Sequence, residues 1–449
     1  MTGSHRASRG GSRAAAREAR RQQTRRRNQL IGAGAAALLV IGGGGIAAVN
    51  AFGGSDSPGD AKSGKGQDDG SGGGDSGLLG DATKTLLDGY AAKQLAPASG
   101  AWAVASTDDG SSAPDKAFVC QSQRFADPAG IRTWIRNFRN PSTKETAVQY
   151  VEVSNDEAAA GKAYSTITGW LSACNTPQIR LVASYTTDGL GSKGVVAVFG
   201  QPGDKSNKYR TISVSTAGQA TMVVEYDTTA KTPPKPDTVI ATAGAGLKRI
   251  CAEAKCTTGT PTAKPGLLPT TEPAGFMAPI DLPVLPSIDK PWVSTAGAAP
   301  KGSGCETEKL DIKKAKPKSY KSQTYVVPEA KVPAEFGLDT MVANFASPAA
   351  ANTYVAAIRK AVDTCKKTQS NATVKATGDV ALGTSIKGES WRASYETGNN
   401  KTFTYRVGIA VSGSRAIYVL YPVLEDLDIT NSGFNEVLIR AAERSAAYK

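Results

Sequence analysis

Two segments of the chain alternate apolar and polar residues in the way that predicts β-hairpins. Thr211–Val214 and Thr221–Tyr226 are rich in β-branched side chains, and Ala217-Gly218-Gln219 lies between them. Residues 404–422 repeat the pattern around Gly413. Because the side chains of a strand point alternately to the two faces of a sheet, this period of two predicts antiparallel strands joined by tight turns.

A longer segment, Asp156–Cys174, has the periodicity of an amphipathic helix instead. Its apolar residues recur three or four positions apart and share one stripe of the helix. They are Ala159, Ala163, Ile167, Trp170 and Cys174. We interpret Trp170 as an anchor of the core and not as a platform for a ligand, because it lies on this stripe.

The chain contains two copies of one structural unit. Residues 148–174 and 339–365 each run through a strand, a short turn, an alanine-rich helix and a final cysteine. The hairpins then match, with the Tyr-Arg pair of residues 209–210 aligned with that of residues 405–406, and each copy closes with a helix. We therefore predict an α+β fold of two tandem repeats, each an antiparallel sheet packed by two or three helices.

An uncharged span precedes the repeats. Leu30–Phe52 has 23 residues without a charge, enough for about 34 Å of helix against a bilayer core of roughly 30 Å. Residues 1–29 hold nine arginines and one acidic residue. This asymmetry predicts a transmembrane signal anchor with its N-terminus in the cytoplasm. The alternative is a cleaved signal peptide, with Val49 and Ala51 as the small residues before the cut; a nucleic-acid-binding arm is disfavoured, because the span already explains the basic block.

Changes in composition divide the chain into segments. A stretch rich in Gly, Ser and Asp follows the span and predicts a flexible coil that reaches about 28 Å. A later stretch with nine prolines predicts a semi-rigid spacer, whose apolar second half we expect to lie against a domain. The predicted segments are a basic disordered cytoplasmic tail (1–29), the transmembrane anchor (30–52), a Gly/Ser/Asp linker (53–78), ectodomain repeat 1 (79–257), a Pro-rich linker (258–303) and ectodomain repeat 2 (304–449).

Composition and motifs argue against familiar catalytic chemistry. The only histidine among 449 residues is His5, in the basic tail, so the repeats cannot hold a Ser-His-Asp triad or a histidine-rich metal site. Gly189–Gly194 forms a GxGxxG motif, but a strand follows it, which favours a hairpin turn. Ser287–Lys290 has S-x-x-K spacing without its companion motifs. Asp426–Asn431 imitates the start of a calcium loop but lacks the glycine and the final glutamate. We predict no catalytic, cofactor or metal site.

Six cysteines follow the span, in an oxidising compartment where an even number favours disulfides over metal. They are Cys120, Cys174, Cys251, Cys256, Cys305 and Cys365. Cys174 and Cys365 both end the alanine-rich helix, and Cys120 and Cys305 both precede the first strands. We therefore predict Cys120–Cys174 and Cys305–Cys365. The other two should close a small loop, unless one of them pairs with Cys120 or Cys174.

The end of this helix, Trp170-Leu171-Ser172-Ala173-Cys174, resembles the corresponding helix of the PknH-like extracellular sensor domain, the ectodomain of a group of actinobacterial receptor serine/threonine kinases. Residues 189–199 and 382–395 are similar to the hairpin that follows it in that family. The resemblance covers roughly residues 80–257 and 278–449. It implies disulfide-braced domains with an open cleft that receives an extracellular signal.

The chain departs from that family in three ways. The 29 residues before the span hold no kinase domain, so sensing would not be transmitted by phosphorylation from this chain. Ala361 stands in the second copy where the first has Trp170, and four cysteines lie in the first copy against two in the second.

The sequence as a whole predicts a membrane-anchored extracytoplasmic module that binds or senses a ligand at the cell envelope without catalysis. The alternatives are a structural envelope protein and a carboxylate-dependent hydrolase, because paired carboxylates have no sequence signature. The expected partners are an unknown extracellular ligand or envelope component and the membrane, but no nucleic acid. Residues 79–449 carry 42 basic and 34 acidic residues, a mild excess for binding anionic wall polymers.

Overall fold

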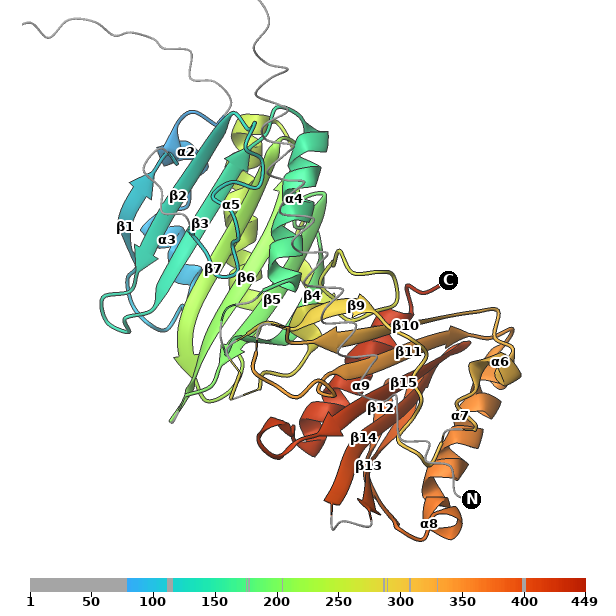
Figure 1. The fold of residues 1–449 in the computed structure, drawn as a ribbon. Helices are drawn as coiled ribbons and strands as arrows, with labels where there is room; N and C mark the ends of the chain where they lie inside the picture. The colour runs from blue at the N-terminus through green and yellow to red at the C-terminus, as the bar shows by residue number, and fades with distance from the viewer. Residues whose placement is uncertain are drawn as a thin grey trace, which may run out of the picture.

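The structure, a computed structural model, contains two antiparallel sheets with helices on their faces (Figure 1). It describes residues 79–449 except 111–115, 175, 177, 204, 286, 289, 307, 329 and 398–400. The predicted cytoplasmic tail, membrane span and first linker lie outside the described residues. The mixed α+β class that the sequence predicts is confirmed.

The first sheet has eight strands in the order β1-β2-β3-β7-β6-β5-β4-β8. They are β1 (Ala103–Asp108), β2 (Arg132–Arg139), β3 (Thr146–Val153), β4 (Arg180–Asp188), β5 (Lys193–Gln201), β6 (Asn207–Ala217), β7 (Ala220–Ala230) and β8 (Thr262–Pro265). The predicted hairpin of β6 and β7 is confirmed. It turns at Gly218, whose φ of 55° lies in the left-handed region that suits glycine.

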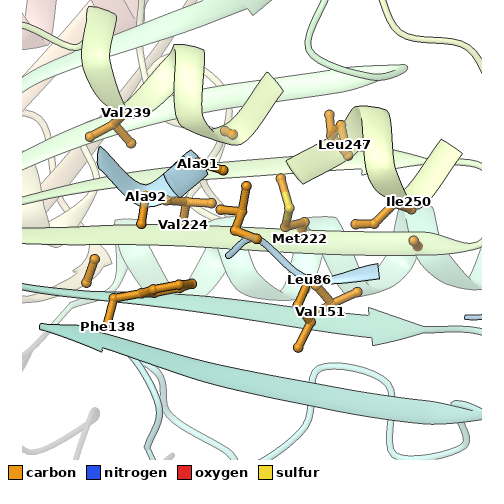
Figure 2. Close-up of a cluster of buried hydrophobic side chains, with 14 of the residues drawn as sticks. Leu86, Ala91, Ala92, Phe138, Val151, Met222, Val224, Val239, Leu247 and Ile250 are labelled. Atoms are coloured by element: carbon orange, nitrogen blue, oxygen red, sulfur yellow. The ribbon is translucent and has the colours of Figure 1, made fainter. Parts of the chain in front are cut away.

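Helices cover both faces of this sheet, and together they form the first domain. α4 (Glu157–Ser172) packs against β6 and β7 on one face, and α5 (Asp237–Ala254) packs against the same strands on the other. Side chains of β7 alternate accordingly, with Val223 in the core beneath α4 and Met222 in the core beneath α5. Figure 2 shows Met222 close to Leu247 of α5.

The residues that follow the predicted first linker fold directly onto the α5 side of the first sheet. They form α2 (Ala82–Thr85), α3 (Gly89–Ala92) and the short 3₁₀ helix η1 (Lys93–Leu95). Leu79 and Leu86 are buried in the same core as α5. Trp134 of β2 donates a hydrogen bond from its indole Nε1 to the carbonyl of Leu79 at 2.9 Å. The first domain is therefore folded from Leu79 onward.

The second sheet has seven strands in the order β12-β13-β14-β15-β11-β10-β9. They are β9 (Val293–Ala296), β10 (Ser319–Val326), β11 (Leu338–Asn344), β12 (Ala372–Leu382), β13 (Ile386–Thr397), β14 (Lys401–Ser412) and β15 (Arg415–Val423). One face carries α6 (Ile312–Ala315), α7 (Pro348–Asp363) and α8 (Cys365–Thr368), and the other carries α9 (Asn431–Ser445), which follows the 3₁₀ helix η3 (Glu425–Leu427). These elements form the second domain.

The two domains share one topology. Read from its other end, the first sheet runs β4-β5-β6-β7-β3-β2-β1, which is the strand order of the second sheet, and β8 is an addition at its edge. α4 and α7 occupy the same place in this order, as do α5 and α9. Trp102 and Trp292, both buried, directly precede the equivalent edge strands β1 and β9. The repeat therefore extends further than the sequence motifs indicate.

The proline-rich stretch is not the spacer that its composition predicts. Its β8 pairs with β4 in the first sheet, and its β9 pairs with β10 in the second. Between them, Met277, Leu282 and Trp292 are buried in the core beneath α9. Prolines break regular structure but leave the apolar residues between them free to pack, so this segment belongs to both domains. The expectation that its second half lies against a domain agrees with the structure.

A buried ion pair joins the second domain to this stretch. Arg444 of α9 donates from Nε to Asp281 Oδ2 at 2.8 Å and from Nη2 to Oδ1 at 3.2 Å, while its Nη1 donates to the carbonyl of Leu268 at 2.6 Å. Asp281 ends the 3₁₀ helix η2 (Pro279–Asp281), which contacts α4 and β4 of the first domain. The pair therefore lies at the junction of the domains.

Trp170 lies at the margin of the buried stripe of α4. The buried residues of the helix are Ala160, Ala163, Tyr164, Ile167, Thr168, Leu171 and Ser172. Trp170 is half-buried, and its ring lies 6.3 Å from that of Phe118. The prediction that Trp170 anchors the core is therefore met only in part, because the helix turns a slightly different stripe toward the sheet.

Candidate functional site

Three disulfides brace the two domains. Cys120 pairs with Cys174, Cys305 with Cys365, and Cys251 with Cys256, at sequence separations of 54, 60 and 5 residues. The first two are the pairs that alignment of the two copies predicts, and the third is the small loop expected of the remaining cysteines. Cys120 and Cys305 lie after the first strand of each domain, not before it as predicted, because β1 and β9 come earlier in the chain. In each domain one disulfide ties the segment between the first and second strands to the end of the long helix, and the short loop at the end of α5 is peculiar to the first domain.

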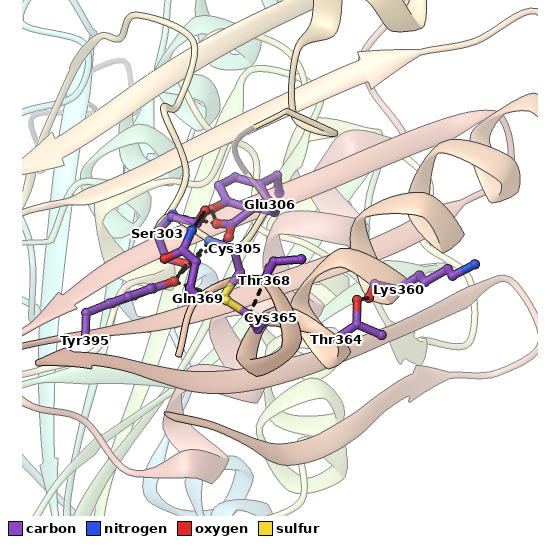
Figure 3. Close-up of a disulfide and its surroundings, with 11 residues drawn as sticks. Ser303, Cys305, Glu306, Lys360, Thr364, Cys365, Thr368, Gln369 and Tyr395 are labelled. Carbon is purple, nitrogen blue, oxygen red and sulfur yellow. Dashed lines mark hydrogen bonds between the residues drawn. A yellow bond between two sulfur atoms is a disulfide. The ribbon is translucent and has the colours of Figure 1, made fainter. Parts of the chain in front are cut away.

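The residue after the first cysteine of each copy folds back onto the chain before it. Gln121 Oε1 accepts the backbone N–H of Ala117 at 2.6 Å, and Glu306 Oε1 accepts that of Ser303, also at 2.6 Å. The hydroxyl of Ser303 also donates to Glu306 (Figure 3). The hydroxyl of Tyr418 donates to Glu306 as well. Both residues are buried, so each disulfide segment is held in one conformation.

A groove of about 580 Å³ lies beside the second disulfide, on the face of the sheet that carries α7 and α8. It is lined by Ser303, Gly304, Glu308, Gln369, Tyr395, Thr397, Phe403 and Tyr405. The hairpin of β13 and β14 supplies the three aromatic residues. Tyr395 lies directly opposite Phe403 in the register of the two strands, and Tyr405 lies opposite Ala393 on the same face. The aromatic side chains therefore form one wall.

Hydrogen bonds hold the polar side of this groove. The hydroxyl of Tyr395 is 2.9 Å from that of Ser303 and accepts the backbone N–H of Cys305 at 3.0 Å (Figure 3). Gln369, which follows α8, donates from Nε2 to the carbonyl of Gly304 at 2.8 Å. Phe403 is 52% exposed although it is large and apolar. The groove is thus preorganised on one side and offers an exposed aromatic ring on the other.

The first domain has charged residues at the matching positions. Counting back from the turn glycines Gly218 and Gly413 places Lys208 and Arg210 where the second domain has Phe403 and Tyr405. Both charged residues form ion pairs with the carboxylate of Asp227, at 3.2 and 3.4 Å. The two copies therefore differ in chemistry at a shared location.

The predicted match of the two Tyr-Arg pairs is wrong by one position. Arg210 is eight residues before Gly218, whereas Arg406 is seven residues before Gly413. Both hairpins are paired without a bulge. A shift of one residue turns a strand side chain to the opposite face. Arg406 accordingly points to the α9 side, where its Nε donates to Asp428 at 2.7 Å.

Two buried glutamates hold the disulfide segment of the first domain. Glu225 Oε2 accepts the backbone N–H of Val119 at 2.7 Å, and Glu152 Oε1 accepts that of Ala126 at 2.8 Å. Burial, together with the charge of Asp227, raises the pKa of Glu225 to about 8. Burial also raises the pKa of Glu152. These carboxyl groups are occupied in positioning the chain, and neither was identified from the sequence.

The short motifs that resemble nucleotide-binding, catalytic and calcium-binding sequences have structural roles. Gly189 and Gly191 have φ of 75° and 70° in the turn between β4 and β5, as the hairpin interpretation predicts. Ser287 donates its hydroxyl to the carbonyl of Asp426 at 3.0 Å. Asp428 accepts from Arg392 and Arg406; burial alone would raise its pKa, but these hydrogen bonds hold the pKa below its usual value. In the segment that resembles a calcium loop, Asp428 therefore holds the side chains of Arg392 and Arg406.

Two further grooves lie elsewhere in the described part of the protein. A crevice of about 50 Å³ lies between the end of α4 and the proline-rich stretch, and a groove of about 360 Å³ lies along α5. None of these three grooves is lined by two carboxylates, and each has at most one, Glu308 in the aromatic groove and Asp237 beside α5.

Among the described residues, no group of three or more His, Cys, Asp or Glu side chains is placed to hold a metal ion. Within the same part of the chain, no helix has the length and apolar character needed to cross a membrane. No model of a known protein family matches the chain, and no curated protein matches its sequence.

Proposed function

We propose that this chain is a membrane-anchored, non-catalytic module of the cell envelope that binds or senses an extracytoplasmic ligand in the aromatic groove of its second domain. The observation that carries the proposal is the exposed ring of Phe403 in a groove of about 580 Å³ whose opposite side is braced by a disulfide and hydrogen bonds. Pockets that combine aromatic walls with a few placed polar groups are typical ligand sites.

The tandem, disulfide-braced α+β domains support kinship with PknH-like sensor domains. A hydrolase would need two carboxyl groups about 5–10 Å apart at its site, and the groove offers only Glu308. A structural envelope protein would have no use for a preorganised groove with an exposed aromatic ring. Ligand binding therefore explains more of the observed geometry than either alternative.

The proposal is tested by amide hydrogen exchange on the full-length chain in detergent, with and without soluble muropeptides from a peptidoglycan digest. We expect slower exchange in the segment that contains Phe403 and in the one that contains Gln369. Phe403→Leu should abolish this protection, whereas Tyr320→Leu, which removes another exposed ring of the same sheet, should preserve it. Unchanged exchange in both groove segments at millimolar muropeptide would contradict the proposal.

Membrane anchoring is tested separately by cysteine labelling. In a Ser4→Cys variant, a membrane-impermeant thiol reagent should fail to label the N-terminus of intact cells and should label it after lysis. Labelling of intact cells would refute the proposed orientation, and a mature chain beginning near Phe52 would show that the span is removed.

A further inference from the structure

The aromatic groove has an unusual charge for this protein. The whole chain has a formal net charge of +13, yet no lysine or arginine is among the described residues that line the groove. The one charged side chain in the lining is the carboxylate of Glu308, which is exposed. Lys401, on the same face of the hairpin, lies two positions beyond Phe403 and is not part of the lining.

A second carboxylate lies behind the wall. Glu306 is fully buried, and the donors to its side chain among the described residues are the uncharged groups of Ser303 and Tyr418. No salt bridge to a lysine or arginine involves it in the described part of the chain. Glu306 is thereby held in place by the protein, so the preference of the groove for positive charge comes from the exposed carboxylate of Glu308.

The aromatic residues add to this preference. The faces of Tyr and Phe rings carry partial negative charge and attract cations within about 6 Å. The rings of Tyr395 and Tyr405 are 6.4 Å apart with planes 67° from parallel, and Phe403 lies beside Tyr395 across the hairpin. Rings at such angles present both faces and edges to a bound group, as in aromatic cages for ammonium ions.

The first domain offers a comparison at the same location. There, the positions of Phe403 and Tyr405 hold Lys208 and Arg210, and these cations are neutralised by Asp227. In the second domain these positions hold aromatic rings, and the carboxylate of Glu308 lines the groove beside them. The protein itself supplies positive charge at this location in the first domain, whereas in the second domain the location is open to a ligand.

We propose that the ligand of the aromatic groove is an organic cation that presents a primary or quaternary ammonium group. This inference rests on the proposed function and names the ligand class of the same site. The ammonium group lies against the rings of Phe403 and Tyr405, and the carboxylate of Glu308 pairs with it from the polar side. Neutral ligands of the same shape gain the contact with the rings but not the electrostatic attraction.

Calorimetric titration of the full-length chain in detergent tests this inference with two probes of equal shape. Choline carries a quaternary ammonium, and 3,3-dimethyl-1-butanol replaces its nitrogen by carbon. We expect choline to bind at least tenfold more tightly. Phe403→Leu should weaken choline binding by about threefold to thirtyfold, the range that follows from cation–π energies. Glu308→Gln should weaken it by up to about fivefold, as expected for an exposed ion pair. Tyr320→Leu and Glu436→Gln, which alter exposed residues outside the groove, should leave it unchanged.

The outcomes separate this inference from the proposed function. Equal affinity for the two probes, both weakened by Phe403→Leu, would overturn the ammonium assignment and leave a ligand groove in place. Failure of choline to bind, or binding insensitive to both groove variants, would also overturn the assignment. The muropeptide exchange experiment then decides whether the groove binds a ligand at all.

Discussion

Replacing Arg444 by methionine is expected to destabilise the junction of the two domains. The side chain of Arg444 is 7% exposed and that of Asp281 is fully buried. Methionine fills a similar volume but leaves the carboxylate of Asp281 with one hydrogen bond, from the backbone N–H of Ala278 at 2.8 Å. The variant therefore measures the cost of leaving the buried carboxylate of Asp281 without its charged partner.

The magnitude follows from the geometry of the pair. Unit charges about 4 Å apart attract by about 4 kcal/mol at an effective dielectric constant of about 20. Removing one partner of a buried pair costs about 3–5 kcal/mol, since the other loses this attraction while it stays out of water. The variant also loses the hydrogen bond to the carbonyl of Leu268, worth about 1.5–3 kcal/mol for a charged donor. We expect Arg444→Met to lower the free energy of unfolding by at least 3 kcal/mol.

Urea unfolding of the full-length chain, followed by circular dichroism, measures this loss. Asp281→Leu should cost a similar amount, because it leaves the guanidinium buried and unpaired. The double variant should cost less than the sum of the two, because no buried charge remains. Arg440→Met, which breaks the half-exposed pair of Arg440 with Glu443 on the same helix, serves as the control and should cost under about 1 kcal/mol.

Two results would refute this reasoning. One is a loss of stability in Arg444→Met that is no greater than in Arg440→Met. The other is a double variant whose cost equals the sum of the single variants, since this would show that the two side chains are not coupled.

Three further predictions concern stability. Burial raises the pKa of Glu225 to about 8, above its usual value of 4.5, which applies to the unfolded chain. Stability should therefore fall as the pH rises between these values, and Glu225→Gln should reduce this fall in urea titrations at pH 5 and 8. Replacing the disulfide of Cys120 by two serines should cost about 4 kcal/mol, and replacing that of Cys251 about 2 kcal/mol, because the closed loops differ in length; equal losses would contradict this account. Gly413→Ala meets no atom within 4 Å and should cost about 1–2 kcal/mol from its φ of 58° alone, whereas Gly191→Ala would place a Cβ 2.3 Å from the carbonyl oxygen of Thr216 and should lower the melting temperature further.

Local patterns were sufficient for much of the fold. Alternation predicted the β6–β7 hairpin, and the 3.6-residue period predicted α4, because each of these elements forms between residues close in sequence. Pairing of the cysteines followed from the repeat, since two copies with one topology bring equivalent residues together. The sequence thus predicted the class, the two copies and the disulfides.

The candidate site was not predicted, because its residues are far apart in sequence. Gln369 follows α8, Tyr395 lies in β13 and Phe403 lies in β14, and none of them belongs to a recognisable motif. Along a strand, an aromatic residue that lines a groove follows the same alternation as one that packs in the core. The sequence pattern therefore does not distinguish the two. The one available signal was the difference between the copies at Phe403 and Lys208, and the error of one residue in aligning the Tyr-Arg pairs obscured it.

By itself, the sequence determined those features that depend on neighbours along the chain: the hairpins, the long helices, the repeat and the pairing of cysteines. Tertiary structure alone decided that the proline-rich stretch adds a strand to each sheet, which face Arg406 points to, and that Arg444 meets Asp281 across 163 positions of the chain. These outcomes depend on which apolar surfaces are buried together and on the register of strands, where a shift of one residue exchanges the two faces of a sheet.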